Sequence, residues 1–152
     1  MKIHFCRSKG IAAWLIRVGT MSAFNHVAVE VDGHIIHSTG ARGVHQLARA
    51  SDLKKDYYRI EAVSIEGVDR EAAFGFLRGQ LGKGYDWGAV FAMPFRAGWR
   101  DRYRWFCSEL AAAALEAGGL KLRLPGYRIT PRDLYVALPV TEGKPSVSAG
   151  AG

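Results

Sequence analysis

The segment from His26 to Ser38 constrains the fold more than any other part of the sequence. Residues 26–31 are rich in β-branched side chains, and residues 34–38 form a second, mostly apolar run. Between them stands Asp32-Gly33, a dipeptide that favours the tight turn of a β-hairpin. We therefore predict two antiparallel strands here, and an antiparallel sheet or partial barrel built around them.

The remaining elements follow from periodicity and from turn residues. Further strands are predicted over residues 2–6, 44–47, 57–65 and 135–140, and helices over residues 9–18, 69–81, 86–93 and 107–117. The helix over 9–18 places Ile11, Leu15 and Val18 on one face, with Trp14 adjoining and Ser8 as its predicted cap. Thr130 before Pro131 predicts the start of a short helical turn.

Length and composition favour one domain. The chain has 152 residues, of which 49% are hydrophobic, and this is enough to bury a core. We expect a single α+β domain over residues 1–140, followed by a flexible C-terminal tail over 141–152, which is polar and small-residued.

The formal charge of +7 indicates an affinity for anionic partners. The densest cationic cluster consists of Arg96, Arg100, Arg102 and Arg104, interrupted by aromatic residues and Asp101. We interpret this cluster as a solvated loop beside a pocket. The alternative, that it binds a nucleic acid or an anionic lipid, stays open.

Two cysteines, Cys6 and Cys107, are too few for a disulfide framework. The apolar stretch after Lys2 is too short and mixed for a secretory signal, and residues 11–16 are too few to span a bilayer. We therefore expect a cytoplasmic protein without a transmembrane segment. A phage-associated protein, or one exported by a non-classical route, fits the sequence equally well.

Cys107 stands where the clearest helix of the sequence begins. Backbone amides and the helix dipole at such a position stabilise a thiolate, and the same amides can hold an oxyanion. These properties make Cys107 a candidate nucleophile, whereas the alternative is a buried, inert cysteine. Glu109, two residues further on, is interpreted as an acid that satisfies the helix dipole, and the alternative is that it faces the site.

His26 opens the first hairpin strand, where an imidazole can reach the start of a packed helix. Residues equidistant from a hairpin turn stand side by side, so His26 is predicted to pair near Ser38 or His37. His37 would then hydrogen-bond the far nitrogen of His26 and fix its tautomer, as the third member of a catalytic triad does. The alternative is that these are surface histidines.

A metal site is not expected. His34 and His37 fall on opposite faces of a strand, and the sequence has no CxxC or HExxH motif. No cofactor is predicted either.

Taken together, these segments resemble the circularly permuted NlpC-type papain-like cysteine peptidases and acyltransferases, which include the YiiX-like bacterial proteins and, more distantly, lecithin retinol acyltransferase. The resemblance rests on three stretches, which are residues 25–37 with Gly43-Val44, residues 84–87 with 105–110, and residues 129–135. The histidine hairpin precedes the cysteine helix, as in the permuted branch.

The resemblance implies a permuted papain-like fold and a role for each matching residue. Cys107 matches the nucleophile, His26 the general base and His37 the residue that orients the base. Tyr85 matches a tyrosine near the nucleophile, although the loop between them is longer here, and with Ser108 it is expected to contact the oxyanion or substrate.

We therefore expect a thiol hydrolase that cleaves an amide bond, in a peptide or a peptidoglycan fragment, through a thioester on Cys107. A lipid or N-acyl transferase, or an amidase, on the same scaffold is one alternative. The other is a non-catalytic binding module for anionic ligands, for which the interaction would be sensitive to salt.

Overall fold

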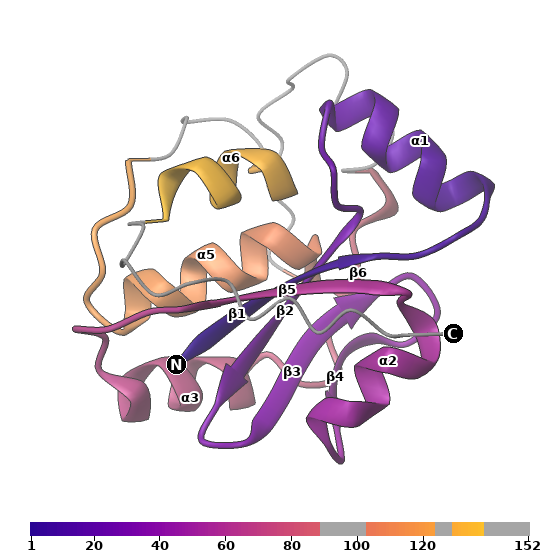
Figure 1. Ribbon diagram of the computed structural model, residues 1–152. Coiled ribbons are helices and arrows are strands. Elements are labelled where there is room, and N and C mark those ends of the chain that lie inside the picture. Colours follow the sequence, from indigo (N-terminus) through magenta and orange to yellow (C-terminus); the bar gives the residue numbers. More distant parts are fainter. Residues whose placement is uncertain (89–102, 124–128, 139–152) are drawn as a thin grey trace.

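The computed structural model describes residues 1–88, 103–123 and 129–138, and its centre is a five-stranded antiparallel sheet with the strand order β4-β3-β2-β1-β5 (Figure 1). The strands of this sheet are β1 (Lys2–Arg7), β2 (His26–Val31), β3 (His34–Thr39), β4 (Gly43–Leu47) and β5 (Arg59–Ser64). Two short strands, β6 (Gly84–Tyr85) and β7 (Arg104–Trp105), form a separate parallel pair. The predicted α+β class is confirmed.

Helices cover both faces of the sheet (Figure 1). They are α1 (Ile11–Thr20), η1 (Ala50–Asp52), α2 (Leu53–Asp56), α3 (Arg70–Arg78), α5 (Cys107–Ala117) and α6 (Pro131–Ala137). The larger core lies between the sheet and helices α3, α5 and α6, whereas Leu53 of α2 packs in a smaller core on the other face. No helix within the described ranges is long and apolar enough to cross a membrane.

The alternation of side chains along β2 explains why the sheet has two cores. Val27, Val29 and Val31 belong to the larger core beneath α5, and Ala28 belongs to the smaller one beside Leu53. Successive side chains of a strand point to opposite faces, so the apolar sequence of β2 suits a strand that is covered on both sides.

The predicted hairpin is confirmed, and its turn has the expected backbone conformation. Asp32 and Gly33 both have positive φ, at 48° and 84°. This is the combination that a two-residue type I′ turn requires. Val31 and His34 close the turn as the first pair of the β2–β3 ladder.

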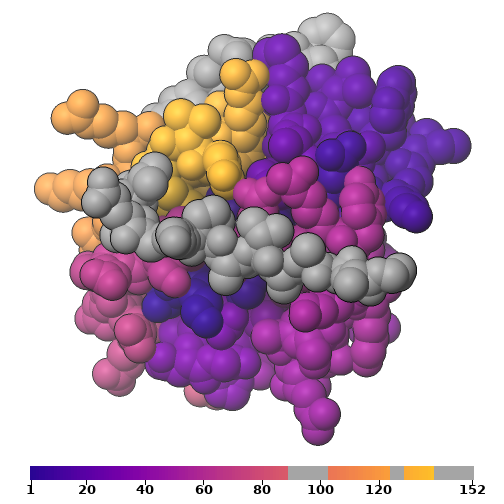
Figure 2. Space-filling view, in the orientation of Figure 1, coloured from indigo at the N-terminus to yellow at the C-terminus, as the bar shows by residue number. Residues whose placement is uncertain are grey.

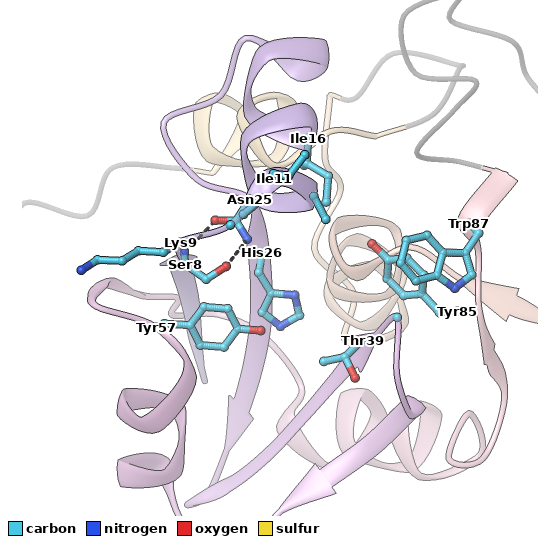
Figure 3. Close-up of a pocket in the computed structure, with 14 residues that line it drawn as sticks. Ser8, Lys9, Ile11, Ile16, Asn25, His26, Thr39, Tyr57, Tyr85 and Trp87 are labelled. Carbon is cyan, nitrogen blue, oxygen red and sulfur yellow. Dashed lines mark hydrogen bonds between the residues drawn. The ribbon is translucent and has the colours of Figure 1, made fainter.

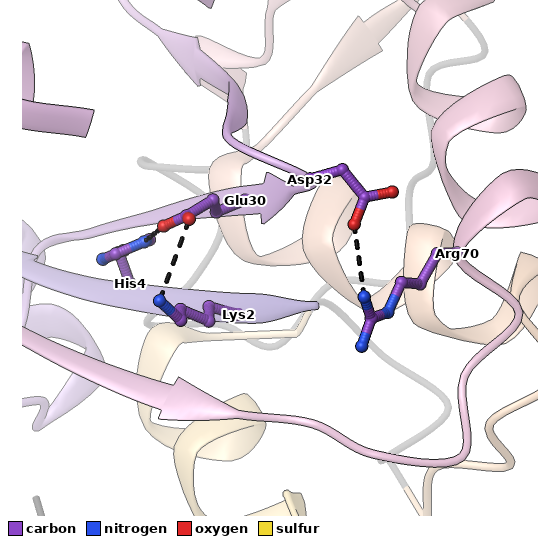
Figure 4. Close-up of polar contacts among 5 residues, drawn as sticks. All are labelled: Lys2, His4, Glu30, Asp32 and Arg70. Atoms are coloured by element: carbon purple, nitrogen blue, oxygen red, sulfur yellow. Dashed lines mark hydrogen bonds and ion pairs between the residues drawn. The ribbon is translucent and has the colours of Figure 1, made fainter. Parts of the chain in front are cut away.

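Polar contacts connect β1 and α3 to this hairpin (Figure 4). His4 on β1 contacts Glu30 on β2, with 2.6 Å between Nε2 and Oε2, and Lys2 pairs with the same carboxylate at 3.9 Å. At the turn, Arg70 donates to Asp32 over 3.3 Å and links the start of α3 to the hairpin. These contacts reinforce a register in which β2 is held by β1 on one side and β3 on the other.

Helix α5 has the predicted bounds, but the predictions for α1 and α6 need correction. Ser8 does not cap α1, because the helix begins at Ile11 with Gly10 as its N-cap residue, and the Ser8 hydroxyl accepts a hydrogen bond from the Asn25 side chain instead. The predicted strand over 135–140 is wrong over residues 135–137, which belong to α6. Thr130 and Asp133 form a capping box there, and Pro131 occupies the first helical position.

Other predicted elements differ from the observed ones in length, or fall outside the described residues. The helix predicted over 69–81 ends at Arg78, and η1 with α2 was not predicted. Most of the helix predicted over 86–93, and the tail over 141–152, lie outside the described residues. The same holds for Arg96, Arg100 and Arg102 of the cationic cluster, whereas Arg104 is an exposed residue of β7.

Candidate functional site: a histidine relay beside a buried cysteine

Three histidines from neighbouring strands form a continuous chain of hydrogen bonds, which we call the histidine relay. Nε2 of His26 on β2 lies 2.9 Å from Nδ1 of His37 on β3. Nε2 of His37 lies 3.0 Å from Nε2 of His45 on β4. The chain ends at the backbone, because Nδ1 of His45 lies 3.0 Å from the carbonyl oxygen of Gly43.

Strand register explains how the three rings meet. His37 stands directly opposite His45, and its partner on β2 is Ala28. Continued by two residues, this register places Thr39, the neighbour of Ser38, opposite His26, so the pairing lies close to the predicted one. His26 and Ala28 share a face of the sheet, so the His37 ring reaches His26 along the diagonal. The hydrogen bond predicted between His26 and His37 is nevertheless present.

The Gly43 carbonyl fixes the tautomer of the whole relay. A carbonyl oxygen only accepts, so Nδ1 of His45 must carry a proton, and Nε2 of a neutral His45 is then an acceptor. Nε2 of His37 therefore donates to His45, which leaves Nδ1 of His37 as the acceptor for His26. A neutral His26 must carry its proton on Nε2, and its Nδ1 keeps a free lone pair.

Burial keeps the first two members of the relay neutral. The pKa of His26 lies well below its usual value because burial disfavours the charged ring, and His37 and His45 add to this effect. Burial, followed by His45 and Arg42, lowers the pKa of His37 to about 3. Both rings are therefore uncharged at neutral pH, as the tautomer assignment requires.

Cys107 lies at the same end of the sheet as His26. It is the first residue of α5, which packs along β2. Backbone groups of Val27, the residue after His26, and of Ser108 lie close enough to its sulfur to lower the pKa of the thiol. The segment before Cys107 is bound to β3, because the Ser38 hydroxyl donates a hydrogen bond to the Trp105 carbonyl over 2.8 Å.

The thiol of Cys107 is held in its protonated form. Burial raises the pKa of Cys107 to about 12, and Glu109 also raises it, against the lowering effect of the backbone hydrogen bonds. The shift is opposite to the one that a helix N-terminus alone predicts. With Cys107 only 1% exposed, the desolvation of a thiolate outweighs the helix amides. The resting pair is thus a neutral thiol and a neutral imidazole.

A pocket of about 300 Å³ opens at His26 (Figure 3). Ile11, Ala12, Ala13 and Ile16 of α1 line one part of the pocket, and Thr39 and Trp87 lie across from Ile11 and Ile16 in Figure 3. The pocket therefore combines an apolar wall with the imidazole of the relay. Cys107 is not among the residues that line it.

Two tyrosines flank His26 in the pocket (Figure 3). The ring of Tyr57 stacks on that of His26, with centroids 5.0 Å apart and planes 5° from parallel. Tyr85, a predicted site residue, lines the other side and packs against Phe106. Burial raises the pKa of both phenols, and a charge on Cys107 would raise it further. Both are therefore neutral hydroxyl groups near the cysteine.

The remaining predicted residues have different surroundings. The Ser108 hydroxyl is buried and donates to the Ile129 carbonyl over 2.6 Å, whereas its backbone lowers the pKa of Cys107. Glu109 is buried close enough to Cys107 to raise its pKa. Cys6 stands opposite His26 in the β1–β2 ladder, and burial raises the pKa of its thiol.

Sequence reasoning missed His45 and Tyr57 as site residues. His45 was detectable only from the register of β3 and β4, and Tyr57 was assigned to a strand that begins two residues later. Within the described ranges, no group of three or more histidines, cysteines or carboxylates is arranged to hold a metal ion. The relay histidines bond to one another in a line rather than converging on a point.

Comparison with known proteins adds no assignment to this geometry. The chain matches no protein-family model and no curated protein. The site is therefore interpreted from its own chemistry.

Proposed function

We propose that this protein is a thiol hydrolase that cleaves an amide or ester bond, with Cys107 as nucleophile and His26 as general base. The observation that carries the proposal is the histidine relay. It leaves the lone pair of Nδ1 on a buried His26, at the end of the sheet where α5 begins with Cys107. A buried hydrogen-bonded chain that fixes one imidazole tautomer is what a general base requires.

The reaction would proceed from the neutral pair. The Cys107 sulfur attacks the substrate carbonyl carbon as its proton passes to Nδ1 of His26, since a free thiolate is disfavoured by burial. The carbon–nitrogen or carbon–oxygen bond then breaks, and His26 returns the proton to the leaving amine or alcohol. Water, deprotonated by His26, attacks the resulting thioester, and Cys107 leaves as the thiol.

Oxyanion stabilisation would come from groups at the start of α5. Backbone groups of Val27, Ser108 and Cys107 itself lower the pKa of the Cys107 thiol, which supports this assignment. Tyr85 is a second candidate donor, because its buried phenol stays protonated and lines the pocket. Tyr57 and Tyr85 flank His26 in Figure 3, and in the proposed mechanism the substrate carbonyl enters between them.

One observation favours a second candidate, the transfer or hydrolysis of a lipid-type acyl group on the same residues. The α1 wall of the pocket is built from Ile11, Ala12, Ala13 and Ile16. An apolar wall suits an acyl chain better than a polar stem peptide. The chemistry at Cys107 would be the same, and only the acyl donor and acceptor would differ.

The test is direct detection of the acyl-enzyme. The protein is incubated with p-nitrophenyl esters of short and long acyl chains and with peptide amides, and acyl adducts are located by peptide mass spectrometry. We expect a hydroxylamine-sensitive adduct on Cys107, accompanied by release of p-nitrophenol. His26→Gln should slow acylation by about 10²-fold or more.

The two cysteines provide a matched control, because both are buried free thiols. Cys107→Ala should abolish the adduct and the release, whereas Cys6→Ala should preserve both. Release that persists unchanged in Cys107→Ala, or adducts on Cys6 alone, would refute the proposal.

A further inference from the structure

Helix α1 turns an apolar stripe toward solvent. Its side chains are between 51% and 79% exposed, and they are those of Ile11, Trp14, Leu15, Val18 and the C-cap residue Met21. Their spacing of three and four residues is that of one helix face, which in most globular proteins packs on the core. Here the helix buries Ala13 and Thr20 instead. A contiguous apolar surface of this kind marks an interaction site.

The charged side chains of the N-terminal segment that contains the stripe are all cationic. The first acidic residue of the chain is Glu30, whereas the residues before it include four cations, Lys2, Arg7, Lys9 and Arg17. Lys9 is exposed just before α1, and Arg17 lies within the helix, where it donates to the Ser8 carbonyl over 3.1 Å. The stripe is thus accompanied by basic groups, and α1 contains no acid.

We propose that α1 docks on the surface of a lipid bilayer that contains anionic lipids. The apolar stripe would enter the boundary between headgroups and acyl chains, with Trp14 at the depth that indole prefers, while Lys9 and Arg17 face lipid phosphates. The helix is too short to span a bilayer and would lie in its surface. In Figure 1, α1 stands at one corner of the molecule, and the same corner forms part of the surface in Figure 2.

Charge complementarity favours a bilayer over a second copy of the chain. Two copies packed through their α1 stripes would bring together Lys9 and Arg17 from each, and α1 supplies no carboxylate to offset them. Anionic headgroups provide the missing opposite charge. The net charge of +7 acts in the same direction.

Docking would also orient the pocket. Ile11 belongs to the stripe and lines the pocket, and Ile16 of the same helix lines it as well. The pocket mouth beside α1 would therefore open at the bilayer, where acyl-bearing molecules are concentrated. The docking itself does not depend on the proposed chemistry, and Cys107→Ala should bind vesicles as the wild type does.

The test is flotation of the full chain with vesicles of phosphatidylcholine alone and of phosphatidylcholine with about one third phosphatidylglycerol. We expect flotation with the anionic vesicles, partial loss in high salt, and a blue shift of tryptophan fluorescence. Leu15→Ser with Val18→Ser should weaken binding by about tenfold or more, because both are exposed apolar residues outside the pocket lining.

A matched control changes exposed apolar residues elsewhere. Leu81→Ser with Val136→Ser, on the turn after α3 and on α6, should leave vesicle binding unchanged, and circular dichroism should show both double variants folded. Three results would overturn the proposal. These are no flotation of the wild type, flotation that the α1 variant does not weaken, and concentration-dependent self-association that the α1 variant abolishes, which would assign the stripe to a second copy.

Discussion

Nε2 of His26 and Nδ1 of His37 lie 2.9 Å apart, and both nitrogens are buried. Two ring nitrogens at this distance must share one proton, so the tautomer of one ring dictates that of the other. Which nitrogen donates in each hydrogen bond is decided at the other end of the relay, where the Gly43 carbonyl accepts a hydrogen bond from His45. The tautomer of His26 is therefore set by His45, the third histidine of the relay, which hydrogen-bonds His37 but not His26.

His45 is accordingly predicted to be a positioning residue. His45→Ala removes the acceptor for Nε2 of His37, and we expect acylation of Cys107 to slow by about tenfold or more because the His26 tautomer is no longer fixed. His45→Gln should retain most of the rate, since its side-chain oxygen can accept the same hydrogen bond. Nitrogen NMR of the imidazoles supplies an independent readout.

In that NMR measurement, the wild type and His45→Gln should carry the His26 proton on Nε2, and His45→Ala should show a mixture of tautomers. A pure Nδ1-protonated His26 in the wild type would contradict the relay.

Acid should destabilise the fold through the same histidines. The folded pKa values of His26 and His37 are lowered from 6.5, so below that pH the unfolded chain binds protons that the folded chain does not. The free energy of unfolding should therefore fall as the pH drops from 6.5 toward 3, by at most about 1.4 kcal/mol per pH unit for each ring. Urea titrations across this range measure the slope.

His37→Gln should flatten that slope by the contribution of one imidazole. His34→Gln is the matched control, because His34 is an exposed histidine on the same strand. An unchanged slope in His37→Gln would show that His37 is not held neutral by the fold.

The elements that sequence predicted best are those with local signals. Asp32 and Gly33 favour the positive φ angles that their turn requires. Helix α5 begins at Cys107 and ends before the two glycines that follow Ala117. These features need no knowledge of distant parts of the chain. The order of the histidine hairpin and the cysteine helix could therefore be read directly.

The features that sequence missed depend on tertiary register or on burial. His45 joins the relay only because β4 pairs with β3 so that it faces His37. The raised pKa of Cys107 reflects the depth at which α5 begins, which helix position does not reveal. Likewise, the pattern of α1 is the same whether its apolar face is buried or exposed.

The Cys107 thiol should lose its proton only at alkaline pH. With the pKa raised to about 12, alkylation by iodoacetamide in a Cys6→Ala background should accelerate steadily with pH and show no plateau up to about pH 10. Denatured protein should instead level off above about pH 8.5. A plateau below neutral pH in the folded protein would mean that a thiolate–imidazolium pair forms at rest, contrary to the neutral pair described above.

Gly43 is predicted to be indispensable for the relay, because its carbonyl is the final acceptor and its backbone has no room for a side chain. Its φ is +63°, and a Cβ atom there would lie 2.2 Å from the Lys83 carbonyl oxygen. Gly33 has a similar φ of +84° but open space around it, so Gly33→Ala isolates the cost of the backbone conformation.

That conformation costs about 1–2 kcal/mol for a residue with a Cβ atom, and Gly43→Ala must in addition displace the Lys83 carbonyl, which accepts from Val44 over 2.8 Å. We expect Gly43→Ala to lower the free energy of unfolding by more than Gly33→Ala does, and to disturb the His26 tautomer in the nitrogen NMR spectrum. Equal destabilisation by the two substitutions, with an unchanged tautomer in both, would show that the relay does not depend on the position of the Gly43 carbonyl.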